Sequence, residues 1–230
     1  MKFLGENPFY TLLLLTEKPG KWPRWSLVPL PLAFAALAGL AWASAGGPAW
    51  GWATAGLLLV MALADGALLS FLPRSGSSFG PMQPPFLALS VLRGLLAVAA
   101  ALLARWGAAL PWALHGTVQI ALCFLAAYGT LVEPFLVQVT RLEIATPRLA
   151  NPGGPLRVVQ LSDLHVERLT RREMALPGTV AGLDADVMVL TGDYLNTTYN
   201  QDPQALADLE ELLLQLETPG KRYAIWGSPE

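Results

Sequence analysis

The chain has little charge and few of the side chains that bind metals or form disulfides. Only 14% of its 230 residues are Asp, Glu, Lys or Arg, against about 25% in typical soluble domains. Its single cysteine, Cys123, excludes an intrachain disulfide, and its apolar surroundings predict a buried side chain. The net charge of −2 argues against a nucleic-acid partner. In contrast, 53% of the residues are hydrophobic, which predicts a membrane protein.

The charged residues are unevenly distributed along the sequence. Between Ser26 and Thr140 the only Asp, Glu, Lys and Arg residues are Asp65, Arg74, Arg93, Arg105 and Glu133. Four apolar segments in this region each approach the roughly 20 residues that a helix needs to cross a bilayer. They span about 27–45, 50–72, 86–104 and 109–132. The predicted domains are an N-terminal arm at 1–24, a four-helix transmembrane region at 25–136, a linker at 137–155 and a soluble domain at 156–230.

Lysine and arginine side chains predict how the chain is oriented, because they gather on the cytoplasmic side. The N-terminal arm carries four, the loop at 73–85 carries one and the stretch after the fourth apolar segment carries three. The loop at 105–108, on the opposite side, carries one. We therefore expect a multi-pass cell-membrane protein with a cytoplasmic N-terminus and a cytoplasmic C-terminal domain. In the arm, Phe9–Leu15 is apolar but too short to span, which predicts an interfacial helix.

Three ionisable side chains inside the predicted spans allow two interpretations. Asp65, Arg93 and His115 could together form a polar site, since intramembrane ionisable groups are often functional. Alternatively, Arg93 pairs with Asp65 and joins two helices, or extends toward the interface, while His115 lies near an interface. The second interpretation describes the more common situation.

The soluble part alternates between apolar runs and helical segments, a pattern typical of an α/β fold. Strands are predicted at the apolar runs within 158–165 and 186–193 and at 223–227, and helices at about 168–183 and 203–217. Pro177 and Gly178 are expected to break or kink the first helix. Asp202 precedes Pro203 and predicts the N-cap of the second. Alternating apolar residues after Val137 predict one further strand in the linker.

Polar side chains follow two of these apolar runs. Asp163 and His165 follow the first, and Asp193 follows the second after Gly192. In an extended strand, residues i and i+2 point to one face, so Asp163 and His165 are expected to share one space. A right-handed crossover would make the strands parallel and bring Asp193 to the same edge. Two carboxylates and one imidazole suit a divalent ion such as Mn, Fe or Zn.

These blocks, D-x-H at Asp163–His165 and G-D at Gly192–Asp193, resemble those of calcineurin-like metallophosphoesterases. The frame RVVQLSDLHV…DVMVLTGDYLN is similar to the integral-membrane bacterial branch of that family, and the resemblance covers about the last third of the chain. It implies a two-sheet sandwich, of which 156–230 is the βαβαβ portion. It also implies two divalent metals, the first bound by Asp163 and His165 and both bridged by Asp193.

The activity implied by the resemblance is hydrolysis of phosphomonoesters or phosphodiesters by a dimetal-activated hydroxide. The apolar helices suggest a bilayer-surface substrate such as a lipid-linked phosphate. Where the family has Gly-Asn-His-Asp/Glu, this sequence has Gly227–Glu230 reading GSPE, and no later histidine block follows. We therefore expect a chain that lacks its C-terminal half and is inactive as it stands. The alternative is a non-enzymatic membrane scaffold or carrier that works through Asp65, Arg93 and His115.

Overall fold

The computed structural model of the chain contains two compact units. The structure describes residues 15, 18–105, 110–146 and 154–227. The first unit comprises Met1–Arg74 and Pro81–Thr130, and the second comprises Ser75–Gly80 and Leu131–Glu230. Apart from Leu15, the predicted interfacial helix at Phe9–Leu15 lies outside the described residues.

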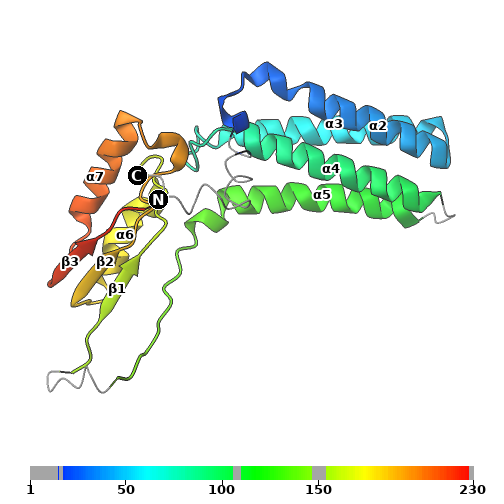
Figure 1. Ribbon diagram of the computed structural model, residues 1–230. Helices are drawn as coiled ribbons and strands as arrows, with labels where there is room; N and C mark the ends of the chain where they lie inside the picture. The colour runs from blue at the N-terminus through cyan, green and yellow to red at the C-terminus, as the bar shows by residue number, and fades with distance from the viewer. Residues whose placement is uncertain (1–14, 16–17, 106–109, 147–153, 228–230) are drawn as a thin grey trace. The chain divides into compact units, whose positions relative to one another are not determined.

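Four long apolar helices make up most of the first unit (Figure 1). They are α2 Pro29–Gly46, α3 Pro48–Phe71, α4 Gln83–Ala104 and α5 Leu110–Leu131. Four stretches of 22 to 24 residues, one around each helix, are long and apolar enough to cross a bilayer, which confirms the four predicted apolar segments. The helices are apolar on all sides rather than along one stripe, as expected of helices surrounded by lipid.

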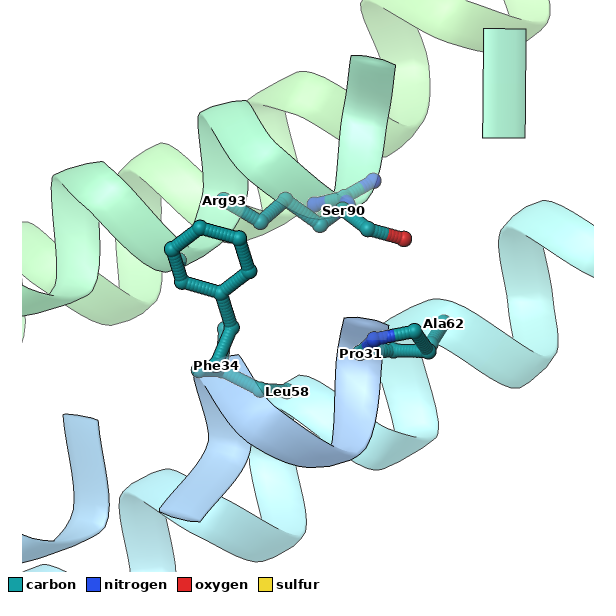
Figure 2. Close-up of a pocket in the computed structure, with 7 residues that line it drawn as sticks. Pro31, Phe34, Leu58, Ala62, Ser90 and Arg93 are labelled. Carbon is teal, nitrogen blue, oxygen red and sulfur yellow. The ribbon is translucent and has the colours of Figure 1, made fainter. Parts of the chain in front are cut away.

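Small residues allow the helices of this unit to approach closely. A Cβ atom placed on Gly51 of α3 would lie 2.7 Å from the carbonyl oxygen of Gly39 in α2. A Cβ atom on Gly94 of α4 would lie 2.2 Å from the Phe34 ring, which lies beside Arg93 in a small pocket (Figure 2). Glycine at these positions therefore allows close packing of the helices.

The second unit is built on three parallel strands joined by two helices (Figure 1). The elements are β1 Val158–Leu161, α6 Arg171–Ala181, β2 Val187–Leu190, α7 Pro203–Gln215 and β3 Lys221–Ala224. The strand order is β1-β2-β3, with Val159 opposite Met188 and Leu190 opposite Ala224. The predicted order of strand, helix, strand, helix and strand is therefore found, with the third strand slightly earlier than expected.

Both helices pack on the same face of this sheet. Met188 of β2 is fully buried, in a core with Leu176 of α6 and Leu212 of α7. The residues that point to the other face are more exposed, including Val158 at 55% and Tyr223 at 54%. The alternation of buried and exposed residues along β1 and β2 thus follows the two faces of the pleat.

Three details of the second unit differ from the sequence predictions. Helix α6 continues through Pro177, because a capping box between Thr170 and Glu173 fixes its first turn and Leu176 anchors it in the core. The sequence also predicts an apolar stripe along α7 that includes Leu206, but this side chain is 46% exposed. In the described part of the linker, 137–146 and 154–155, no strand forms, because the alternating residues have no neighbouring strand to pair with.

Candidate metal centre

Backbone hydrogen bonds hold together the loops that follow β1 and β2. The amide of Asp163 donates to the Gly192 carbonyl at 3.3 Å, and the amide of His165 donates to the Asp193 carbonyl at 3.0 Å. One residue further on, Val166 and Leu195 form an isolated parallel bridge. The pairing of the strands thus extends past their ends and brings both motifs to one edge of the sheet, as the sequence predicted.

The three candidate ligands all have left-handed backbone conformations. The φ angles are 54° at Asp163, 46° at His165 and 52° at Asp193. The expectation that the chain stays extended through Asp163 and His165 is therefore wrong. The inter-loop hydrogen bonds instead hold each residue in a conformation that costs an L-residue about 1–2 kcal/mol. Such conformations cluster at functional sites, where the surrounding structure enforces them.

The side chains of these residues converge. One potential ligand atom from each of Asp163, His165 and Asp193 lies within 4.8 Å of the other two. The His165 Nε2 atom is 3.8 Å from Asp163 Oδ1, and the Ser162 hydroxyl donates to the other carboxylate oxygen of Asp163 at 2.5 Å. Asp163 and His165 remain about half exposed, with relative side-chain exposures of 63% and 46%. The group is therefore open to solvent and to a ligand.

The donor set fits one divalent cation. Two carboxylates and an imidazole are the mixture of oxygen and nitrogen donors that Mn, Fe and Zn accept. Two carboxylates held close together also repel each other, and a bound cation offsets that repulsion. Three donor side chains among the described residues are too few to complete the coordination of two metal ions. The residues present thus support a single site more directly than the dinuclear site that the family resemblance implies.

The loop that follows β3 also reaches this edge of the sheet. Gly192 has a φ of 93°, and a Cβ atom placed on it would lie 2.4 Å from the Cα atom of Gly227. Glycine at 192 is therefore required both by its backbone conformation and by the contact with Gly227. Ser228, Pro229 and Glu230, which stand where the family has Asn, His and an acid, lie outside the described residues.

Sequence reasoning missed a group of residues around the centre. Glu167, two residues after His165, accepts hydrogen bonds from Asn196 and from the backbone amide of Phe79. Phe79 lies in the segment between α3 and α4, which belongs to the second unit. The Tyr199 hydroxyl donates to the Phe79 carbonyl. Burial, with a further contribution from the Glu167 carboxylate, raises the pKa of Tyr199 above its usual value.

Comparison with known proteins gives one distant and partial similarity. The chain is 28% identical over 114 residues to the UDP-2,3-diacylglucosamine pyrophosphatase LpxG of Chlamydia trachomatis serovar D. The match covers 49% of this chain but only 34% of that relative. It supports a relationship to phosphoester hydrolases at a general level. No protein-family model matches the chain, and no solved structure matches it.

The polar side chains of the apolar helices form a separate network in the first unit. Arg93 donates to both carboxylate oxygens of Asp65, at 2.7 and 2.8 Å, and to the backbone carbonyl of Gln119 at 2.8 Å. The Gln119 amide in turn donates to the Arg93 carbonyl at 3.1 Å. The predicted pairing of Asp65 and Arg93 is confirmed, whereas Gln119 was not anticipated. Cys123, expected among apolar groups, is half-buried and 3.3 Å from Arg93.

His115 does not join this network. It is buried, and its ring lies 5.8 Å from the ring of Trp42, centroid to centroid. The three ionisable residues therefore divide into a hydrogen-bonded pair and a histidine that packs against an aromatic ring. This arrangement matches the interpretation in which Arg93 and Asp65 join two helices, except that His115 is buried.

Proposed function

We propose that this chain is part of a membrane-bound, metal-dependent phosphoester hydrolase whose metal ligands are Asp163, His165 and Asp193. The observation that carries the proposal is their convergence at the ends of β1 and β2, each with a left-handed backbone. The distant similarity to a pyrophosphatase supports the same class of reaction. The finer assignment, to the calcineurin-like metallophosphoesterases, rests on the D-x-H and G-D blocks.

The residues of this chain would bind and orient the metal, and the substrate would approach it from the solvent-exposed side. The Ser162 hydroxyl fixes one oxygen of Asp163 and leaves the other facing His165. The backbone bond from His165 to Asp193 sets the separation of the two loops. When bound, a divalent ion supplies Lewis-acid chemistry that polarises a phosphoryl group and offsets its developing charge.

The proposed substrate class is a phosphoester or pyrophosphate attached to a lipid. Four helices long and apolar enough to cross a bilayer precede the candidate centre in the same chain. The relative named above is, by its name, a pyrophosphatase of a diacylated sugar nucleotide. A lipid-linked substrate combines these two observations, because its phosphate would be held at the bilayer surface.

The proposed orientation places the second unit on the cytoplasmic side. That unit includes two segments adjoining apolar helices, Ser75–Gly80 and the stretch after Leu131. Arg171 of α6 lies 3.8 Å above the ring of Phe135 in the latter stretch. With four spans, both segments emerge on the same side, and the distribution of Lys and Arg favours the cytoplasm.

A scaffold or carrier function is less well supported. A carrier site requires polar groups that are free to bind cargo, but Arg93 and Asp65 satisfy each other and Gln119. Such a saturated network more simply holds α3, α4 and α5 together. The pocket beside Arg93 is small and is lined mainly by apolar residues.

The test is metal binding by the 230-residue chain purified in detergent. We expect Mn²⁺ to bind with a stoichiometry near one by titration calorimetry, and we expect Asp193→Ala to abolish the binding heat. The control is Glu210→Ala, which removes an exposed carboxylate from α7 far along the sequence from the centre. If Mn²⁺ does not bind, or if it binds equally well to Asp193→Ala, the proposed metal centre is wrong.

Hydrolysis is tested on the same samples. Bis(p-nitrophenyl) phosphate reports general phosphodiesterase activity, and a diacylated sugar-nucleotide in mixed micelles reports the proposed substrate class. Hydrolysis that requires Mn²⁺ and is lost in Asp193→Ala would show that the 230-residue chain is active and that its activity depends on this centre. A preference of the purified protein for soluble nucleotides over the acylated substrate would contradict the lipid-linked assignment.

A further inference from the structure

Glu167 is the meeting point of three segments that are distant in sequence. Its Oε2 atom accepts hydrogen bonds from the Phe79 amide at 2.6 Å and from the Ser78 hydroxyl at 3.1 Å. Its Oε1 atom accepts one from the Asn196 side-chain amide at 2.9 Å. Ser78 and Phe79 lie between two apolar helices, whereas Asn196 follows the candidate ligand Asp193 by three residues.

The same short stretch of backbone sets the geometry of the candidate ligands. Between His165 and Glu167, the Val166 amide donates to the Tyr194 carbonyl at 2.8 Å, and the Val166 carbonyl accepts from Asn196 at 3.2 Å. The Glu167 side chain adds to these contacts by accepting a hydrogen bond from the side-chain amide of the same residue, Asn196. Any movement of Glu167 is therefore transmitted to the two loops that carry the ligands.

The carboxylate is well suited to this role because all three partners donate. Glutamine has a single acceptor oxygen, so its NH₂ group would face either the Phe79 backbone amide or the Asn196 side-chain amide, and each of these presents a donor. Asn196 cannot simply turn round, because its side-chain oxygen already accepts from the Thr198 amide at 3.0 Å. A nearly isosteric change at 167 thus breaks the junction while conserving its shape.

We infer that Glu167 is a positioning residue that couples the segment Ser75–Gly80 to the metal centre. It is not one of the candidate ligands. Binding of a cation by Asp163, His165 and Asp193 and binding of the segment by Glu167 favour the same arrangement of loops, so each strengthens the other. The segment between two membrane helices therefore responds to occupancy of the centre, and this inference rests on the proposed metal function.

The experiment is hydrogen–deuterium exchange of the full chain in detergent, followed at the peptide that contains Phe79, with and without Mn²⁺. In the wild type we expect Mn²⁺ to slow exchange at Phe79. In Glu167→Gln we expect exchange to become at least about tenfold faster and Mn²⁺ affinity to fall about 10- to 100-fold, the scale typical of lost outer-shell contacts. Glu210→Gln, which changes an exposed carboxylate on α7, should change neither value.

A second variant guards against simple misfolding. Tyr199→Phe removes only the hydroxyl that holds the Phe79 carbonyl and should also release the segment and weaken Mn²⁺ binding, by less than Glu167→Gln. If the wild type binds Mn²⁺ but Glu167→Gln binds it equally well, or if Mn²⁺ leaves Phe79 exchange unchanged, the coupling is wrong and the proposed function stands. If the wild type binds no Mn²⁺, both are overturned.

Discussion

Gly192 and Gly227 are in backbone contact where the loops after β2 and β3 meet, and this contact leaves no room for a side chain at position 192. A Cβ atom on Gly192 would come within 2.4 Å of the Gly227 Cα and 2.6 Å of its nitrogen. The backbone of Gly192 is also left-handed, with a φ of 93°. Because Gly192 precedes Asp193, this contact helps to fix the position of Asp193 in the candidate centre.

We predict that Gly192→Ala destabilises the second unit by about 2–3 kcal/mol and weakens Mn²⁺ binding, because it combines a backbone clash with an unfavourable φ. Chemical denaturation followed by circular dichroism gives the free energy of unfolding. The matched control is Gly178→Ala in the middle of α6, where an added Cβ meets nothing within 4 Å. That change should stabilise the helix by about 0.5–1 kcal/mol. Equal effects of the two substitutions would contradict this account of Gly192.

The sequence was sufficient to place the candidate ligands at one sheet edge but not to predict their conformations. Asp163 and Asp193 follow apolar runs of β-type composition, and parallel strands bring their ends together wherever that pattern occurs. The left-handed conformations depend on hydrogen bonds between the two loops, which leave no local mark in the sequence. The extended chain assumed for Asp163 and His165 was wrong for that reason.

Long-range polar contacts were the least predictable feature. The hydrogen bond from Phe79 to Glu167 joins residues 88 positions apart, and the sequence around neither residue indicates this contact. Gln119 was overlooked because it is uncharged, although it completes the hydrogen bonding of Arg93. The pair of Asp65 and Arg93 was predictable, because an isolated charge in an apolar segment requires a partner of opposite sign.

Asp163→Asn should separate metal binding from folding. Asparagine tolerates the left-handed conformation at this position and removes one of two nearby negative charges. We expect the metal-free protein to be unchanged or slightly more stable, on the order of 1 kcal/mol or less, whereas Mn²⁺ affinity falls by at least about tenfold. Thermal unfolding with and without Mn²⁺ measures both. A variant that is destabilised without metal would show that the carboxylate has a structural role instead.

Breaking the ion pair of the apolar helices should be costly. Arg93 and Asp65 are almost fully buried, with 2% and 3% of their side chains exposed. We expect Asp65→Leu alone to destabilise the first unit by about 3–5 kcal/mol, because it leaves a buried guanidinium without its counter-ion. Adding Arg93→Met should recover part of this loss. Unfolding in detergent micelles, compared across the two single variants and the double variant, gives the coupling energy directly.

The cap of α7 should make stability depend on pH in the acid range. The Asp202 carboxylate accepts from the Ala205 and Gln204 amides, both at 3.0 Å, and lies 3.2 Å from Arg168. These contacts, led by the Ala205 amide, lower the pKa of Asp202 below its ordinary 3.8. Because the folded state has the lower pKa, the charge stabilises the fold above pH 3.8, and this contribution is lost as the pH falls below that value.

The comparison that isolates this effect is between Asp202→Asn and the wild type. Asparagine keeps an oxygen that can accept from the same amides but carries no charge. The difference in unfolding midpoint between the two proteins should therefore be constant near neutral pH and shrink as the pH falls through the acid range. A difference that is independent of pH down to pH 2 would contradict the assignment to the carboxylate charge.

The assignment of Ser75–Gly80 to the α/β unit has a consequence for biosynthesis. The ribosome makes this segment between the apolar helices α3 and α4, yet its partners Glu167 and Tyr199 are made about ninety and one hundred and twenty residues later. The α/β unit is therefore discontinuous in the chain and is completed only after the intervening helices α4 and α5 have been synthesised. A fragment that starts at Leu131 would contain all three candidate ligands but would leave Glu167 without Ser78 and Phe79.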